Sequence, residues 1–289
     1  MLSIILRITR IGLAILLASA ATSCKMDIEL PNRISGSGNI ISEKREVNKS
    51  FNKIYVSNAF DVEVLQANEF EVVVKADDNL MPHIVTEIVD NTLKIKFENN
   101  LTIKTYKDIT VYVKMPRIEE LKATLSSTID VKNTINTSDL ILKTTSTGEI
   151  NLLEVNAKSV IAEASSSSEI SIEKLFATEF KAHGTSTADI DVQYLEADIV
   201  DISASSSSDV ELKGKALDLT ISASSTATVD AKELWVNNVI VTASSSATAK
   251  VYPIISLKAK ASSTADVHYY NEPKTINKET SSSGEVVLR

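Results

Sequence analysis

Four acidic residues recur at intervals of 20 residues in the middle of the chain, and each stands directly before an isoleucine or a valine. They are Glu149, Glu169, Asp189 and Asp209. Carboxylate oxygens are the ligands that Ca²⁺ takes in proteins, and a pair of carboxylates is also the machinery of most glycosidases. A third interpretation is a solvated face, which keeps a sheet soluble and hinders lateral pairing.

A second set of acids follows two residues later and includes Asp191, Glu211 and Asp230. Lys and Arg are not interspersed among these acids, and aromatic platforms for sugars are few, so the pattern disfavours catalysis. The sequence favours the solvated face and leaves Ca²⁺ binding open as the alternative.

Three aromatic residues near the C-terminus form the other candidate site. Tyr252 and Tyr270 occupy equivalent positions in successive repeats, and Trp235 lies nearby in sequence. A stacked aromatic pair can hold a sugar ring or a peptide. The alternative interpretation is that these rings cover the last turns of the fold.

Motifs of established enzyme chemistry are absent from the sequence. His83, His183 and His268 are isolated from one another and from Cys24, the chain's only cysteine, and no metal-ligand spacing appears. Nucleophile elbows, phosphate loops and zinc motifs are also missing. The sequence therefore predicts a protein that is not an enzyme and has no cofactor beyond the open possibility of Ca²⁺.

The N-terminus has the pattern of a targeting segment. Arg7 and Arg10 are followed by an apolar run at 11–21, which is too short to span a membrane, and then by small residues ending at Cys24. This pattern predicts a lipoprotein signal peptide at 1–23, a lipidated Cys24 and a tether at 24–33. Ordinary cleavage after residue 23 is the alternative. A lone cysteine also excludes an intramolecular disulfide.

Composition limits the remaining classes of protein. The 289 residues are 43% apolar, with only 7 Gly and 5 Pro, which permits a large core and argues against general disorder. The formal charge is −8, and it becomes −10 without the first 23 residues because Arg7 and Arg10 are lost. This negative charge argues against a nucleic acid as partner.

The acids belong to an internal repeat of nine units, spaced by 18 to 21 residues. We take as the reference residue of each unit the small residue just before the acid–isoleucine or acid–valine pair, or its equivalent. The reference residues are Ser127, Gly148, Ser168, Ala188, Ser208, Ala227, Ala247, Ala265 and Gly284. A linker would not be patterned in this way, so the serine-rich runs belong to a folded repeat.

Within each unit, one parity is apolar or small and the other is polar, as in half-buried strands. Apolar residues dominate the positions two and four after the reference residue, and another apolar column lies seven after it, which Lys215 interrupts. Serine stands two before the reference residue in eight successive units, and its parity predicts an inward column of hydroxyls. These serines are Ser146, Ser166, Ser186, Ser206, Ser225, Ser245, Ser263 and Ser282.

These columns predict an all-β fold, a right-handed parallel β-solenoid with coils of about 20 residues over 121–289. The strand-like but irregular region 34–120 would cap the first coil, and 34–289 would form one structural unit. An antiparallel β-sandwich is the alternative, but it does not require identical columns.

The chain resembles a known family, the head GIN domain proteins of Bacteroidetes, which are auto-transporter adhesin-like. The resemblance rests on "GSGNI" at 36–40, "FNKIYVSNAFDVEVLQ" at 51–66, "KADDNLMPHIVTEIVDNTLKIKF" at 75–97, and the repeat itself, with Gly-Glu-Ile-Asn at 148–151. It implies a β-helical, noncatalytic protein of the cell envelope.

Together with Cys24, the resemblance predicts lipid anchoring in the outer membrane, on its periplasmic or surface side, and a glycan or a protein as surface ligand. Two other classes stay open. One is a polysaccharide lyase or hydrolase built on a β-helix, and the other is a purely structural envelope protein.

Overall fold

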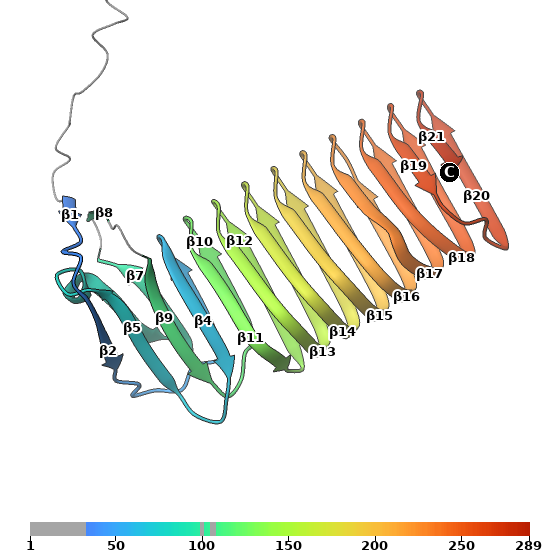
Figure 1. Ribbon diagram of the computed structural model, residues 1–289. Helices are drawn as coiled ribbons and strands as arrows, with labels where there is room; N and C mark the ends of the chain where they lie inside the picture. The colour runs from blue at the N-terminus through green and yellow to red at the C-terminus, as the bar shows by residue number, and fades with distance from the viewer. Residues whose placement is uncertain (1–32, 99–100, 105–107) are drawn as a thin grey trace, which may run out of the picture.

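The computed structural model describes residues 33–98, 101–104 and 108–289 (Figure 1). The predicted signal peptide, Cys24 and all of the tether except Arg33 lie outside the described residues.

The described residues form 21 β-strands and one short 3₁₀ helix, η1 (Met81–His83). The strands of the N-terminal region are β1 (Arg33–Ser35), β2 (Ile40–Arg45), β3 (Lys53–Ser57), β4 (Phe60–Gln66), β5 (Glu71–Asp77), β6 (Ile84–Val89), β7 (Thr92–Phe97), β8 (Thr102–Lys104) and β9 (Ile109–Met115). The strands of the repeat region are β10 (Glu120–Thr124), β11 (Thr128–Asn136), β12 (Asp139–Thr145), β13 (Glu149–Ser165), β14 (Glu169–Thr185), β15 (Asp189–Ser205), β16 (Asp209–Ala223), β17 (Thr228–Ser244), β18 (Thr248–Ser262), β19 (Asp266–Tyr269), β20 (Thr275–Ser281) and β21 (Glu285–Leu288).

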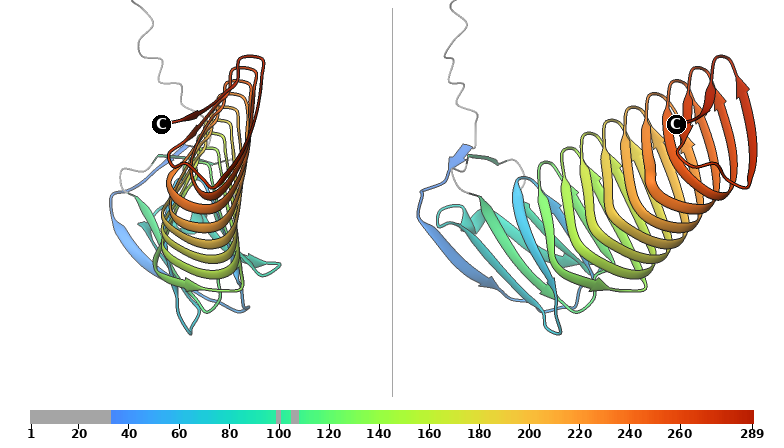
Figure 2. Two further views of the ribbon diagram at one scale, coloured as in Figure 1. Left: turned by 90° about the vertical axis from the view of Figure 1, so that its right-hand side faces the viewer. Right: turned by 45° about the vertical axis from the view of Figure 1, so that its right-hand side comes forward.

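The repeat region is a parallel β-solenoid, as predicted. Each strand from β13 to β18 runs down one side of a coil, around a broad bend and up the other side (Figure 1). Neighbouring coils pair in parallel; for example, Glu169 of β14 is in register with Glu149 of β13 and Asp189 of β15. Viewed along the axis, the stack is a narrow wedge (Figure 2). The alternative of an antiparallel β-sandwich is wrong.

The sharp edge of the wedge is a stack of two-residue turns. In the turn before Ser168, Ser166 and Ser167 have φ values of 60° and 58°. The equivalent turn before Ser208 closes with a hydrogen bond of 3.3 Å from the Ser208 amide to the Ser205 carbonyl. Positive φ at both central positions is the signature of a type I′ turn, which joins strands tightly.

The predicted inward column of serines is wrong. The serines two before the reference residues are exposed or half-buried, because they are the first central residues of the type I′ turns. The alternation of faces does not continue through a turn: Ala164 and Ser168 are both buried, while the three residues between them lie at the surface.

Within the repeat region, the serines that are buried are instead reference residues: Ser127, Ser168 and Ser208. Ser208 Oγ donates to the Gly184 carbonyl at 2.9 Å and accepts from the Ser205 amide at 3.1 Å. Ser168 Oγ makes similar bonds with the Ser165 carbonyl and amide. Each buried hydroxyl is therefore satisfied within or beside its own turn, as burial requires.

The solenoid has one continuous core, which extends from Phe51 to Tyr269. Coil β14 contributes Ile170, Leu175 and Phe180, all fully buried. Burying a side chain of this size stabilises the fold by about 1.5–3 kcal/mol. The repeated inward positions, rather than the turns, therefore supply most of the driving force.

The N-terminal region adds two irregular coils and a cover. Strands β3 and β4 pair in parallel with β10 and β11 on one side and with β7 and β9 on the other. The strands of the outermost of these coils receive antiparallel partners: β5 pairs with β9, β2 pairs with β5, and β6 pairs with β7. This change from parallel to antiparallel pairing closes the end of the stack, where an open edge would invite aggregation.

Two motifs behind the family resemblance meet at this end. The Gly38 amide donates to Asp77 Oδ1 at 2.5 Å, and the Ser37 amide donates to Asn79 Oδ1 at 2.8 Å. Asn79 Nδ2 in turn donates to the Ser35 carbonyl at 2.8 Å. The "GSGNI" and "KADDN" segments thus form a joint that holds the start of the fold.

The C-terminal end is closed by a polar pair. Lys278 of β20 takes the inward position that Ala259 holds one coil earlier. Its ammonium lies 4.5 Å from the centre of the Tyr269 ring and donates to the Tyr269 hydroxyl at 2.6 Å. An inward-pointing charge is a recognised protection of an exposed sheet edge.

The buried reference serine and the exposed turn serine make different predictions for the same substitution. Ser208→Leu should lower the free energy of unfolding by about 1–3 kcal/mol, because the site is fully buried and overpacking forces its neighbours apart. Ser206→Leu, two residues away in the same turn, should cost clearly less because its side chain lies in solvent. Urea denaturation of both variants measures this, and equal losses would contradict the assignment of faces.

Candidate ligand-binding surfaces

The acidic ladder predicted from the sequence lies on one side of the wedge. Strand register aligns Glu149, Glu169, Asp189 and Asp209 on four successive coils. The pKa of Glu169 is raised by burial and then by repulsion from Glu149, Asp189 and Asp191. Burial and the charge of Asp209 raise the pKa of Asp189. Among the ion pairs of the described residues, none joins a lysine or arginine to these four acids.

The neighbouring acidic column is different, because lysines are interspersed in it. Glu211 lies between Asp191 and Asp230 in the register. Lys213 pairs with Glu211 at 2.9 Å, and Lys250 pairs with Asp230 at 2.8 Å. The sequence-based view that Lys and Arg avoid the acids is therefore wrong for this column. These ion pairs are not obvious in the sequence. Lys213 stands two residues after Glu211, on the same face of the strand, and Lys250 comes from the coil after that of Asp230.

Within the described parts of the chain, no three His, Cys, Asp or Glu side chains gather in a way that could hold a metal ion. Ca²⁺ binding along the acidic ladder stays a prediction, and the ladder's geometry is that of a solvated face.

The aromatic candidates are partly brought together. Trp235 and Tyr252 are in register on β17 and β18, with ring centroids 6.3 Å apart. The predicted stacking of Tyr252 on Tyr270 is wrong: among the described residues Tyr252 has its ring contact with Trp235, while Tyr270 follows Tyr269 at the end of β19. The register between β17 and β18 shifts between Ala231 and Trp235, so Trp235 meets Tyr252 rather than the residue that the repeat spacing would give.

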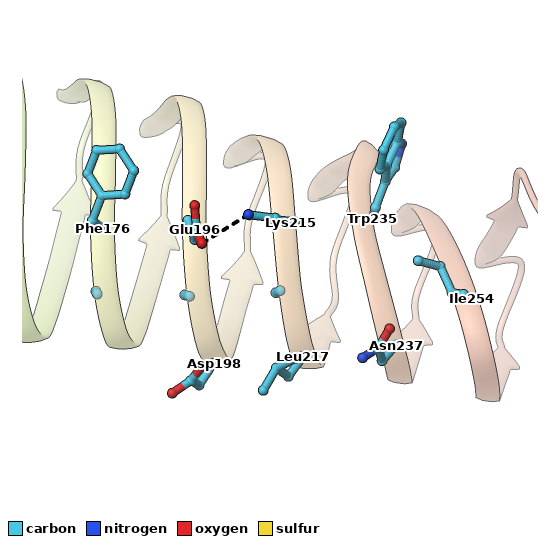
Figure 3. A pocket seen from close by; sticks show the side chains of 11 residues that line it. Phe176, Glu196, Asp198, Lys215, Leu217, Trp235, Asn237 and Ile254 are labelled. Atoms are coloured by element: carbon cyan, nitrogen blue, oxygen red, sulfur yellow. Dashed lines mark ion pairs between the residues drawn. The ribbon is translucent and has the colours of Figure 1, made fainter.

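Trp235 also lines an open groove of about 590 Å³ on the broad bend of the wedge (Figure 3). We call it the bend groove. One wall is the row Phe176, Glu196, Lys215 and Trp235, and the other is the row Asp198, Leu217 and Asn237. The floor consists of Ala177, Ala197 and Ala216, which are in register on β14, β15 and β16.

The coil that contains β16 is one residue shorter than the coil before it, and this shortening shapes the centre of the groove. Gly214, not Lys215, pairs with Leu195 and Leu234, so the interpretation that Lys215 interrupts the apolar column is wrong. Gly214 has a φ of 124°, and a Cβ there would lie 2.1 Å from the Leu195 carbonyl oxygen, so only glycine fits. Lys215 is thereby placed in the outward row beside Glu196.

Lys215 and Glu196 form an ion pair of 3.0 Å across the two coils. The hydrogen bond to Glu196, together with its negative charge, raises the pKa of Lys215 above the usual value. Trp235 remains 60% exposed at one end of the row. At the other end, Phe176 contacts the ring of Tyr194 with centroids 5.9 Å apart.

Sequence reasoning missed the bend groove, although a signal for it exists. The alanines of the floor recur at intervals of 19 and 20 residues, and the row beside them carries an aromatic residue at each end. The solenoid is predicted from its apolar columns. In each coil the last of these columns lies one residue before the row that contains Phe176 and Trp235, so the columns give no indication of the groove.

Comparison with known families matches the one described as "Putative auto-transporter adhesin, head GIN domain" at residues 50–174 and again at 164–273. The chain belongs to the head GIN domain family. The resemblance seen in the sequence is confirmed, and the two overlapping matches reflect the internal repeat of this head GIN domain protein.

Solved structures share the head GIN domain fold. A "putative adhesin" from Parabacteroides distasonis ATCC 8503 has a TM-score of 0.71 at 19% identity, covering 89% of this chain and 100% of that chain. A "putative adhesin" from Parabacteroides merdae ATCC 43184 has a TM-score of 0.66 at 17% identity, with 89% and 99% covered. A "putative lipid binding protein" from P. distasonis ATCC 8503 has a TM-score of 0.64 at 18% identity, with 89% and 99% covered.

A search of curated proteins gave no match to the chain. In the parts of the chain that the structure describes, no helix has the length and apolarity needed to cross a membrane.

The acidic ladder predicts a stability that falls with rising pH. Because the pKa of Glu169 is raised in the folded protein, the folded state binds more protons than the unfolded state from the ordinary pKa of 4.5 up to the raised value. Stability is therefore lost as pH rises through that window. Glu169→Gln should reduce this slope and raise the free energy of unfolding at pH 7 by about 0.2–1 kcal/mol, the size of a cross-strand charge repulsion.

The matched control is Glu163→Gln on the opposite leg of the coil, where Glu163 pairs with Lys143 at 3.0 Å. Loss of an exposed ion pair should leave stability unchanged or slightly lower. Thermal unfolding between pH 4 and pH 8 compares the two, and destabilisation by Glu169→Gln would contradict repulsion along the ladder.

Proposed function

We propose that this head GIN domain protein is a noncatalytic, lipid-anchored binding protein of the outer membrane, with an adhesin-like role. The solenoid would hold its outer faces toward a glycan or protein ligand, from the periplasmic or the surface side. The observation that carries this proposal is the bend groove, an open apolar concavity with a largely exposed tryptophan. Concave apolar surfaces with a few polar groups are typical of ligand sites.

The family description and the names of the neighbours support a binding role at the envelope. One neighbour is named a lipid-binding protein, but the bend groove does not suit an acyl chain. It is open along its length, and the Glu196–Lys215 ion pair forms part of one wall. An apolar chain lying there would desolvate these charges without replacing their contacts with water.

The enzyme alternative receives less support from the groove. A glycosidase needs two carboxylates that flank the bond to be cleaved, one of them as the acid. In the bend groove the Glu196 carboxylate is occupied by its ion pair with Lys215 at 3.0 Å, which leaves Asp198 as the one carboxylate of the lining residues outside that pair.

Retention on coated surfaces tests the proposed function. The purified full-length chain should bind plates coated with mucin or with collagen, measured by antibody, and should release no reducing sugar from mucin. Turnover of a polysaccharide would overturn the noncatalytic assignment. Retention on neither coating would favour the purely structural class.

The lipid anchor is tested at Cys24, which lies outside the described residues. Cys24→Ser should move the protein from the membrane fraction to the soluble fraction, because the thiol that carries the lipid is gone. The control is Ser23→Ala, which leaves the thiol in place and should keep the protein in the membrane fraction. Retention of Cys24→Ser in the membrane fraction would refute lipid anchoring.

A further inference from the structure

The backbone of the bend groove has no free hydrogen-bonding edge. Phe176, Glu196 and Lys215 lie in a continuous parallel ladder, paired with the coil before and the coil after. An extended peptide binds a sheet by adding a strand to an open edge, and that route is closed here. A ligand of this groove must be recognised by side chains alone.

The charges of the groove are nearly balanced. Glu196 and Lys215 neutralise each other at 3.0 Å, and Asp198 at the rim is the remaining charged side chain of the lining residues. The chain as a whole carries −8, and the acidic ladder adds a negative face to the same coils. An anionic ligand would therefore be repelled, whereas the ion pair and Asn237 offer hydrogen-bond donors and acceptors to a neutral ligand with hydroxyl groups.

The aromatic residues offer flat faces at both ends of the groove. Trp235 is supported by Tyr252, and Phe176 contacts Tyr194. Trp235 stands three coils beyond Phe176 in the same row, which is about 14 Å at the usual strand spacing. The alanine floor between the two rows leaves room for a chain to lie from one ring to the other (Figure 3).

Sugar rings combine what this surface can recognise. Their C–H faces pack on aromatic rings, and their hydroxyls bond to carboxylates, amides and ammonium groups such as those of Glu196, Asn237 and Lys215. A sugar ring and the spacing between coils are of similar length, so successive rings can meet successive coils. We propose that the bend groove binds a neutral oligosaccharide that lies along the solenoid axis, an inference that rests on the proposed binding function.

Trp235 is the only tryptophan of the chain, so its fluorescence reports on this groove alone. Cellohexaose, maltohexaose and mannohexaose serve as neutral probes for titration, with heparin and hyaluronan as anionic ones. At least one neutral probe, or a neutral glycan on a printed array, should shift the emission and protect Trp235 from iodide quenching. Binding restricted to anionic glycans, or to none of the neutral glycans, would overturn the inference.

Substitutions locate the site. Trp235→Ala should weaken binding to the retained glycan by roughly ten-fold or more, as loss of an aromatic anchor commonly does, and Trp235→Phe should recover part of it. Tyr112→Ala is the control, since Tyr112 is 39% exposed on β9, far from the groove. Calorimetry measures the affinities and circular dichroism checks folding. Equal affinity of Trp235→Ala and the parent chain would place the site elsewhere and overturn the proposal.

Chemically treated mucin plates distinguish failure of the glycan inference from failure of the proposed binding function. Loss of retention after periodate oxidation of the mucin supports a glycan in the groove. Retention after periodate means a protein ligand, which overturns the glycan and leaves the binding function standing. Absence of retention on untreated mucin and on collagen, together with no response to any glycan probe, contradicts the binding function itself.

Discussion

The fold depends on one constraint: each coil must hydrogen-bond to its neighbours along its whole length. The Glu169 amide donates to the Gly148 carbonyl at 3.0 Å, and the Asp189 amide repeats the bond to Ser168 at 2.9 Å. A residue of one coil is thereby fixed beside its equivalent in the next, about 4.8 Å away. Any residue that recurs in every coil therefore forms a column. Repeated leucines form a core without disturbing the pairing, whereas repeated acids repel one another, and this repulsion adds to burial in raising the pKa of Glu169.

Hydrogen bonding between coils also allows the type I′ turns to form without glycine. A non-glycine residue in the left-handed region costs about 1–2 kcal/mol, and each turn holds two such residues, for example Ser186 and Thr187. The stack offsets this cost because the Thr187 amide donates to the Ser206 carbonyl at 3.2 Å, and the Thr187 hydroxyl lies 2.8 Å from that of Ser167. A lone turn of this sequence would lack both partners. Strain in the turns and pairing between coils are therefore parts of one cooperative arrangement.

Periodicity predicts the strand legs, their inward faces and the parallel stack, because the side-chain period of two and the coil period near 20 are both visible in the sequence. It fails where the backbone leaves that period. Ser206 would point inward only if the alternation of faces continued through the turn. Two residues of that turn adopt positive φ, and the alternation stops there. The repeat spacing wrongly places Lys215 in the core, because this coil is one residue shorter before that position. Gly214 takes the core position instead, which can be recognised only when the strand register is known. The Lys278–Tyr269 closure escapes prediction for a similar reason, since a lysine in a polar segment gives no sign of pointing inward.

A uniform solenoid offers a ligand the same surface at every coil, so recognition of a particular ligand must come from departures from uniformity. In this chain such a departure falls on the broad bend: the shortened coil at Gly214 moves Lys215 outward beside Glu196, and Phe176 and Trp235 flank that pair in the same row. The bend can vary because its outward residues take no part in the core, and because the backbone ladder there absorbs a shift of one residue without losing the coils on either side. The narrow edge has no such freedom, since every turn must close over the next one. The chemistry of the bend, rather than that of the serine-lined edge, is therefore where one member of this fold can differ from another in what it binds.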